Sequence, residues 1–257
     1  MRRRYEISDE QYGRIEPLLS GKPGTPGRNA ENNRRFINAV FWIARTGSPW
    51  PDLPDRFGKY DSVYHRFNNW AKKGRWKAIF EGLQELDLDW CVTYSSVVRA
   101  HQHAVGQKSS AEAEALGRSR GGYSTKIHVA CDALGNPLEI ALTPGQAGDS
   151  PQAKPLLENV LLGPETPRIG AVLGDKGYDS NDLLKYIASL ETEAVIPPKK
   201  NRLEQREISL ELYKDRNKVE RFIGRIKHYR RVATRYEKTA RNYLAMLHLV
   251  SSLVWLL

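Results

Sequence analysis

The order of strand and helix patterns after residue 88 constrains the fold of this 257-residue chain more than any other feature. Three runs rich in β-branched and apolar residues come first, at 89–99, 123–131 and 137–143. Helical and extended patterns then alternate, with helices over 150–161, 181–189 and 209–229 and strands over 169–173 and 193–196. Asp132 to Asn136 has the composition of a hairpin turn. The chain is therefore predicted to form a mixed sheet with helices packed on it.

Three neighbouring strands followed by helix, strand, helix, strand and helix is the order of an RNase H-like fold. Residues 1–85 differ, because helical patterns predominate there. Four helices are expected in them. The first begins at the capping residue Ser8, and the second begins at Asn29 and ends near Thr46. The third and fourth are expected over 61–72 and 75–84. We predict an all-helical domain over 1–85 and an RNase H-like domain over 86–257.

The stretch from 50 to 85 is typical of a helix-turn-helix, with a short Pro-bounded helix, a turn at Gly58 and a second helix. Polar side chains of the second helix that would meet DNA are Tyr64, His65, Arg66, Asn68, Asn69, Lys72 and Lys73. The alternative is a small bundle used only for packing or dimerisation, because any three helices with a basic face can imitate this motif.

The net charge of +10 is unevenly distributed along the chain. Both ends are basic, whereas residues 88–195 carry 13 Asp and Glu against 9 Lys and Arg. Basic surfaces attract phosphate without regard to sequence, and an acidic centre suits divalent cations. This distribution favours nucleic-acid binding over the alternative of a basic protein with solvated charged faces.

Cysteine content and hydropathy argue against a secreted or membrane protein. Cys91 and Cys131 lie in apolar runs and are expected to be buried free thiols rather than a disulfide or zinc site. No apolar signal region follows the basic N-terminus, and the apolar stretch 242–257 is short and interrupted by His248 and two serines. We expect this stretch to be a buried helix or a dimer contact, in a cytoplasmic or nucleoid-associated protein.

One charged stripe is expected on the helix predicted over 209–229. At about 100° per residue, its four members fall within roughly 60° of one face; they are Tyr213, Arg216, Glu220 and Lys227. Apolar residues occupy a neighbouring arc and would seat the helix on a core, namely Leu212, Val219, Phe222, Ile223 and Ile226. An acid flanked by cations suits metal-assisted phosphoryl transfer, although a structural salt bridge is the usual role of such pairs on helices.

Asp175 follows the strand at 169–173 and precedes a glycine turn. A carboxylate at this end of a buried strand is well placed to be a metal ligand, although Asp beside Gly is also common in plain turns. Two-metal phosphoryl transfer needs acidic side chains that converge on ions about 4 Å apart. Asp175 and Glu220 are the candidate catalytic and metal-binding acids, with Arg216 and Lys227 holding phosphates beside them.

These motifs resemble those of insertion-sequence DDE transposases of the IS-five type. The spacing from Tyr213 to Lys227 resembles the third acidic motif of that family, and Asp175 with its neighbours resembles the second. Residues 97–102 resemble the segment after the first catalytic aspartate, and 228–238 the basic continuation after the third motif. The resemblance implies cut-and-paste transposition: Mg²⁺, or Mn²⁺ as a substitute, held by three carboxylates would activate water and later a 3′-hydroxyl at terminal inverted repeats. It also implies a homodimer that binds both element ends and target DNA.

The chain departs from the family at one position, because Tyr94 stands where the first catalytic aspartate is expected. A phenol titrates near pH 10, so it supplies no anionic oxygen at neutral pH, and it is longer than aspartate. Asp87 and Asp89 lie roughly 16–23 Å of extended chain before Tyr94, and Asp132 is expected in the following hairpin turn. None of these acids is expected to replace the missing one. The tyrosine fits a decayed element, a repurposed protein and a deliberate substitution equally well.

The candidate DNA contacts extend over both predicted domains. They are Arg66, Asn69, Lys72, Lys73, Arg99, His101, Lys176, Tyr213, Arg216, Lys227, Arg230 and Arg231. His101 and His103 alternate as zinc ligands can, but without a third ligand we expect DNA contact or packing. The small, polar stretch 106–122, with Arg118 and Arg120, is expected to be a mobile loop that covers DNA or merely connects strands.

Together these features predict an insertion-sequence transposase that binds DNA but is catalytically impaired by Tyr94. A first alternative is a non-enzymatic repressor that occupies the terminal repeats. A second is an interaction protein whose basic faces bind RNA or acidic partners, which the paired acidic motifs disfavour.

Overall fold

The computed structural model describes residues 5–21, 32–106, 109–110, 112–162 and 168–256. They form two compact units. The helical unit comprises residues 1–84, 101–107 and 226–257, and the sheet unit comprises residues 85–100 and 108–225. The first boundary lies near the predicted one, but the C-terminal segment is grouped with the N-terminal helices and not with the sheet.

The helical unit has an aromatic core. Its α-helices are α1 (Asp9–Ile15), α2 (Asn33–Thr46), α3 (Tyr60–Lys72), α4 (Arg75–Glu81), α9 (Arg230–Ala233) and α10 (Ala240–Trp255). Phe36 of α2 lies 5.0 Å from the ring of Trp70 and 5.8 Å from that of Trp76. The apolar helix α10 contacts α2, α3 and α4. Burying its side chains against these helices groups it with the N-terminal part of the chain.

Helix ends in this unit follow local capping rules. Ser8 and Gln11 form a capping box at the start of α1, as the sequence predicts. Asn32 caps α2, which begins at Asn33. The expected start at Asn29 lies outside the described residues. Gly47 ends α2 with φ of +72°, and a Cβ there would lie 2.9 Å from Cβ of Arg230. Only glycine therefore allows both this turn and the close approach of α9.

The predicted helix-turn-helix is only partly present. The segment expected to be its short first helix forms two single-turn 3₁₀ helices, η2 (Trp50–Asp52) and η3 (Asp55–Phe57). Prolines at 49, 51 and 54 explain the difference, because proline lacks the N–H that an α-helix interior needs. The next two helices, α3 and α4, agree with the prediction, although α4 ends at Glu81 before Gly82.

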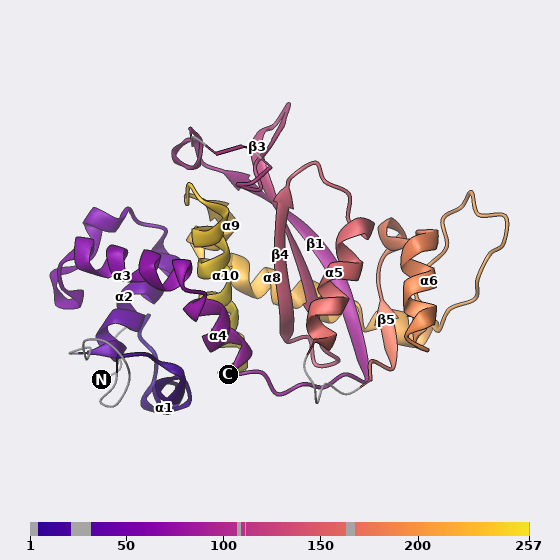
Figure 1. The fold of residues 1–257 in the computed structure, drawn as a ribbon, viewed down its shortest axis with the longest axis horizontal. Coiled ribbons are helices and arrows are strands. Elements are labelled where there is room, and N and C mark those ends of the chain that lie inside the picture. The colour runs from indigo at the N-terminus through magenta and orange to yellow at the C-terminus, as the bar shows by residue number, and fades with distance from the viewer. Residues whose placement is uncertain (1–4, 22–31, 107–108, 111, 163–167, 257) are drawn as a thin grey trace. The chain divides into compact units, whose positions relative to one another are not determined.

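The sheet unit contains a mixed sheet with the strand order β4–β3–β1–β5–β6 (Figure 1). The strands are β1 (Trp90–Ala100), β3 (Gly122–Cys131), β4 (Pro137–Pro144), β5 (Ala171–Leu173) and β6 (Glu193–Val195). The pair β1–β3 and the pair β3–β4 are antiparallel, whereas β5 is parallel to both β1 and β6. This is the predicted RNase H-like order.

Helices cover the sheet on both faces. Helix α5 (Ser150–Leu161) contacts β3 and β4, and α6 (Asn181–Ser189) contacts α5 and β6. Figure 1 shows α5 in front of the strands and α8 (Asn217–Lys227) behind them. The apolar arc of α8 is buried as predicted, at Val219, Phe222, Ile223 and Ile226, whereas Leu212 is half-buried.

Two further predictions are corrected in this unit. The single helix expected over 209–229 is interrupted: α7 (Leu210–Lys214) ends before a turn at Asp215 and Arg216, and α8 begins at Asn217. Backbone bonds of Asp215 N to Leu212 O and of Arg216 N to Tyr213 O span three residues, which tightens the chain there. The stretch 106–122 is not only a loop, because β2 (Gly117–Ser119) pairs with β3. None of the described helices is both long enough and apolar enough to pass through a membrane.

Candidate active site

Tyr94 and Asp175 come from neighbouring parallel strands. Val92 of β1 pairs with Leu173 of β5, and each site residue follows its partner by two positions. The two residues therefore lie at the same level along the β1–β5 pair. Burial, together with the carboxylates of Glu220 and Asp175, raises the pKa of Tyr94, while Arg216 opposes this rise. The phenol is thus neutral and lies among two acids and one arginine.

The residues of the third motif gather around Arg216. Its Nη1 lies 2.8 Å from Oε1 of Glu220, and its guanidinium lies 5.6 Å from the ring of Tyr213. Burial would lower the pKa of Arg216, but Glu220, Tyr213 and Asp175 raise it above its ordinary value. The three residues do not belong to one continuous helix, because Tyr213 lies in α7, Arg216 in the turn and Glu220 in α8. Arg216 and Glu220 keep the i,i+4 spacing of a helix face across this turn, so local chain geometry still brings the pair together.

Lys227, the fourth member of the predicted stripe, is the last residue of α8 and is grouped with the helical unit. It is half-buried, and burial lowers the pKa of its ammonium group. Its predicted role beside phosphate stays a prediction.

Asp149 is an acid near this site that the sequence analysis missed. Its Oδ1 lies 2.8 Å from Nζ of Lys126, and Ser95, the neighbour of Tyr94, also donates a hydrogen bond to it. Burial would raise the pKa of Asp149, but Lys126 and Ser95 hold it below its ordinary range. A Cβ built on Gly177 would lie 2.8 Å from Oδ1 of Asp175 and 3.8 Å from Oδ2 of Asp149, so the two acids flank one glycine. The only sequence signal for Asp149 is its place just before the helix over 150–161.

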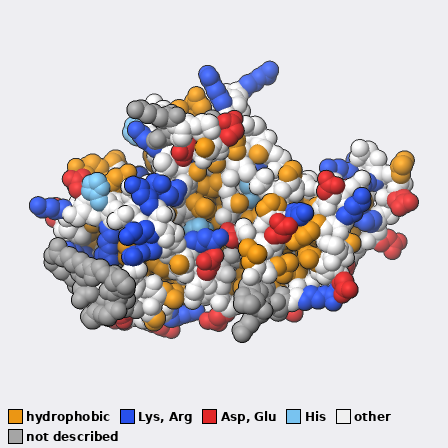
Figure 2. Space-filling model, in the orientation of Figure 1, with side chains coloured by type: hydrophobic (Ala, Val, Ile, Leu, Met, Phe, Trp, Pro, Cys, Tyr) orange, Lys and Arg blue, Asp and Glu red, His pale blue; other side chains and the backbone are white. Residues whose placement is uncertain are grey.

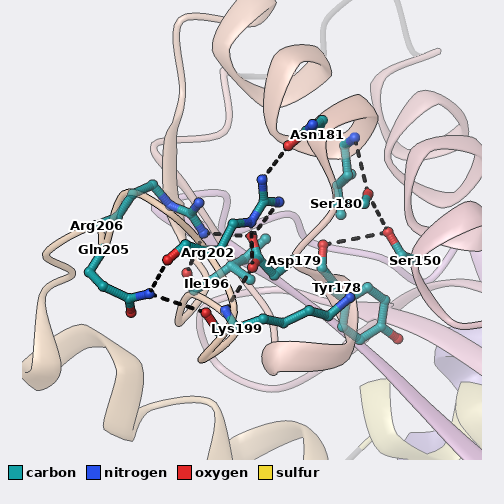
Figure 3. Close-up of polar contacts among 11 residues, drawn as sticks. Ser150, Tyr178, Asp179, Ser180, Asn181, Ile196, Lys199, Arg202, Gln205 and Arg206 are labelled. Atoms are coloured by element: carbon teal, nitrogen blue, oxygen red, sulfur yellow. Dashed lines mark hydrogen bonds and ion pairs between the residues drawn. The ribbon is translucent and has the colours of Figure 1, made fainter.

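The turn that carries Asp175 is held by a buried ionic network. Asp175 Oδ1 accepts a hydrogen bond of 2.7 Å from Gly177 N. Asp179, whose side chain is 0% exposed, accepts from Arg202, Arg206 and the backbone N of Lys199 (Figure 3). Burial would raise the pKa of Asp179, but the two arginines and the Lys199 N–H hold it well below its usual range. This network ties the basic segment after β6 to the Asp175 turn.

The three acids considered as replacements for the missing first aspartate have other roles. Asp132 is buried and caps the hairpin turn, because Oδ1 accepts from Leu134 N at 3.0 Å and from Asn136 N at 2.7 Å. Asp87 and Asp89 precede β1, and Asp87 Oδ1 accepts from the N–H of Asp89. Tyr94 pairs with Val129 in the middle of β3, whereas Asp132 follows the end of β3 and Asp87 and Asp89 precede the start of β1. That none of them replaces the expected first aspartate stays a prediction.

The predicted DNA contacts differ in exposure. Exposed members of the set are Asn69, Lys72, Lys73, Arg99, Lys176 and Arg230. Arg66 is packed instead, since its guanidinium lies 4.1 Å from the Phe36 ring and donates to Asn33, and burial lowers its pKa. Arg231 is buried and pairs with Glu237 at 2.5 Å, so its charge is already balanced inside the helical unit. Charge counting along the sequence does not distinguish such arginines from exposed ones.

Comparison with known proteins identifies the family. The model of a putative transposase of the IS4/5 family (DUF4096) matches residues 7–80, and the model of the transposase DDE domain matches residues 95–255. The chain belongs to the DDE transposases of insertion sequences. The DDE match begins at Ser95, immediately after Tyr94.

Curated relatives and solved structures agree with this placement. The transposase is 40% identical, over 134 residues, to a putative transposase for insertion sequence element IS6501 of Brucella ovis, covering 52% of this chain and 98% of the relative. It is 36% identical, over 130 residues, to an uncharacterized protein of Sinorhizobium fredii, covering 49% and 95%. A piggyBac transposase structure in a synaptic complex with hairpin DNA has a TM-score of 0.50 at 12% identity, covering 96% of this chain and 69% of that one. This last likeness concerns the fold alone.

DDE transposases depend on divalent metal ions. Among the described residues, no three His, Cys, Asp or Glu side chains are close enough together to hold one ion. Glu220 is paired with Arg216, Asp149 is paired with Lys126, and the central position is a neutral phenol. The side chains of this transposase therefore do not fit a complete metal site.

Proposed function

We propose that this transposase binds the terminal inverted repeats of its element and target DNA, and that as written it cleaves DNA weakly or not at all. The observation that carries this proposal is that Tyr94, level with Asp175 on the neighbouring strand, is a phenol whose pKa is raised by burial and by Glu220 and Asp175, so it brings no charge to the site. The carboxylate expected there would supply both a charge and a ligand that the phenol lacks.

DNA binding does not need the missing carboxylate. In Figure 2 the largest group of Lys and Arg side chains on the visible face lies over the helical unit. The exposed cations Lys72, Lys73 and Arg230 belong to this unit and are the proposed phosphate contacts. Since two element ends must be brought together, we propose a homodimer on DNA. The piggyBac structure named as a synaptic complex is similar to this chain in fold, and that similarity does not extend to the assembly.

Metal binding is proposed to be weak in the chain as it stands. Asp175 and Glu220 are the proposed ligands for Mg²⁺, with Mn²⁺ as a substitute. Glu220 would have to give up its 2.8 Å contact with Arg216 to bind an ion. Because two carboxylates neutralise less charge than three, the ions required for cleavage are bound poorly.

The test is a cleavage and strand-joining assay on the element's end DNA with Mg²⁺ or Mn²⁺. It compares the unaltered chain with Tyr94→Asp and with Tyr94→Asp combined with Glu220→Gln. We expect only Tyr94→Asp to cut, by at least about a hundred-fold over the unaltered chain, which corresponds to about 2.7 kcal/mol in the activation barrier. Tyr94→Phe is the matched control, because it keeps the ring and adds no carboxylate. Cleavage by the unaltered chain at the level of Tyr94→Asp would overturn the proposal.

A non-enzymatic repressor is the second candidate, and the same phenol favours it. A repressor predicts tight binding of the terminal repeats and no cleavage even after Tyr94→Asp. Binding assays run beside the cleavage assay separate the two, because an intact but disarmed site regains activity and a decayed one does not.

A further inference from the structure

A cleft lined by residues of the helical unit, and not by Asp175 or Glu220, has the features of a nucleotide site. Its volume is about 740 Å³. It is lined by the chain after α2, by α3, by His101 and His103, and by residues 236–242. Every one of these segments belongs to the helical unit. The chemistry of the site described above does not use any of them.

The walls of this cleft are aromatic. Trp50 lies 5.3 Å from the ring of Tyr64, and His101 lies 4.9 Å from the ring of Tyr236 and 4.5 Å from that of His103. Rings of this kind are the surfaces on which nucleic-acid bases stack, because every base has a flat π-face. An aromatic lining by itself also suits other flat apolar groups, so the polar atoms of the cleft decide the ligand.

Two buried acceptors in the lining have no hydrogen-bond partner among the residues that the structure describes. They are Oε2 of Glu237 and Oδ1 of Asn242. Glu237 is 6% exposed and Asn242 is 7% exposed. The other carboxylate oxygen of Glu237 accepts from Arg231 Nε at 2.5 Å, which fixes the side chain in place. Buried polar atoms are normally paired, so two free acceptors in one cleft call for a ligand that brings N–H donors.

The cations of the cleft lie at its rim. Lys72, Lys238 and Arg241 line it, and Arg241 donates to Asn68 at 3.3 Å. The buried guanidinium, Arg231, is already paired with Glu237. A phosphate would therefore be attracted to the rim and repelled by the carboxylate inside. This polarity orients a nucleotide with its base inward and its phosphate outward.

We propose that this cleft receives one unpaired DNA nucleotide, whose base stacks on the aromatic wall and donates its exocyclic amino group to Glu237 and Asn242. The Watson–Crick edge of an unstacked adenine or cytosine offers such a donor, and extruded bases are commonly held by stacking and edge hydrogen bonds in this way. The inference rests on the proposed DNA binding but not on cleavage.

The test uses the full-length protein and short duplexes of one sequence in fluorescence anisotropy. One duplex is fully paired, one carries an unpaired adenine opposite an abasic position, and one carries an abasic position on both strands. We expect the duplex with the unpaired adenine to bind about ten-fold tighter than the other two, as stacking of one base on aromatic side chains supplies. A duplex with an unpaired thymine, which lacks the amino group, is expected to show a smaller gain in affinity.

Asn242→Leu is the decisive variant. It removes an unpaired buried acceptor and keeps the side-chain volume, so the thermal midpoint should not fall. We expect it to abolish the preference for unpaired adenine while affinity for paired duplex is unchanged. Lys73→Ala is the matched control, because Lys73 is exposed and does not line the cleft; it should weaken all three duplexes alike.

The outcomes separate this inference from the proposed function. Binding of paired and unpaired duplexes with equal affinity overturns the inference and leaves DNA binding intact. Failure to bind any duplex overturns the proposed function as well. A preference for unpaired adenine that survives Asn242→Leu also overturns the inference, because the base would then be held elsewhere. Full competition by free dAMP, at concentrations near the dissociation constant for DNA, overturns it too, because the site would then serve a free nucleotide.

Discussion

Each unit of this transposase contains an arginine–carboxylate pair, and the two pairs lie in opposite surroundings. In the helical unit, Arg231 and Glu237 have side chains 7% and 4% exposed. In the sheet unit, Arg216 and Glu220 have side chains 23% and 45% exposed. The buried pair is fixed, because either charge left alone would be costly inside the protein. The Arg216–Glu220 pair is more exposed and can exchange partners at little cost, which suits the proposed role of Glu220 as a metal ligand.

The largest expected effect comes from breaking the buried pair. Glu237→Ala leaves the Arg231 charge buried without a carboxylate and should lower the free energy of unfolding by about 3–5 kcal/mol. Chemical denaturation monitored by tryptophan fluorescence measures this. Glu237→Gln, which keeps the shape, should cost less. A loss below about 1 kcal/mol in Glu237→Ala would show that the buried pair behaves like a surface one.

A second substitution tests the ionic network beside the active site. Asp179→Asn removes the charge that two arginines share and should cost about 2 kcal/mol, because hydrogen bonds to charged groups are stronger than neutral ones. We also expect faster proteolysis of residues 197–209. Asn181→Ala is the control, since it removes one partner of Arg202 at the rim of the network. Unchanged proteolysis in Asp179→Asn would mean that the segment is held by other contacts.

Acidification should destabilise both units through buried histidines. Burial lowers the pKa of His248 in the helical unit to about 3 and that of His128 in the sheet unit to about 4. The unfolded chain binds these protons at about pH 6.5, so stability is full above that pH and falls as pH drops toward the folded values. Each fully buried histidine should contribute about 1.4 kcal/mol per pH unit in this window.

Thermal denaturation between neutral and mildly acidic pH measures this dependence. His248→Leu should flatten part of the pH dependence, because His248 lies within α10 and stacks on Phe80 at 5.3 Å. If the pH profile is the same in His248→Leu, titration of other groups dominates.

The smallest expected effect on stability comes from the exposed pair. Glu220→Gln should change the free energy of unfolding by less than about 1 kcal/mol. In the Tyr94→Asp background, however, the same substitution should remove the restored cleavage. Stability and activity measured on one sample compare the two effects directly. A large stability loss would assign Glu220 a structural role and weaken its proposed role as a metal ligand.

Local sequence signals were sufficient for the regular elements. Helices α5 and α6 begin and end where they were predicted, because Pro151 suits the first turn of α5 and Ser180 caps α6. The three antiparallel strands lie within two residues of their predicted bounds. The pattern predicts one helix across the break at Asp215 and Arg216, because Leu212 and Val219 keep helical spacing on either side of it.

The active-site residues were only partly accessible to sequence reasoning. Motif spacing predicts Tyr94, Asp175 and Glu220 as site residues, and in the structure both acids contribute to the raised pKa of Tyr94, while their catalytic roles stay proposals. The sequence gives no motif for Asp149, and its contacts with Lys126 of β3 and Ser95 of β1 join it to residues distant in the chain. Arg231 is predicted as a DNA contact from its charge, but it is buried in the structure. The sequence does not reveal this burial, because it depends on contacts with Glu237 and with Ser48, which lies far away in the sequence.

The sequence by itself determined the order of strands and helices and the family, and it is the source of the proposal that Tyr94 stands in place of a catalytic aspartate. These follow from residue identity and from short-range periodicity, which are properties of the chain before it folds. Tertiary structure alone decided that Asp149 and Asp175 flank Gly177 and that the C-terminal helix packs with the N-terminal helices. It also decided that Glu237 and Asn242, each with a buried acceptor unpaired among the described residues, line an aromatic cleft. Contacts between residues distant in sequence depend on how buried surfaces fit together, and no local pattern encodes that fit.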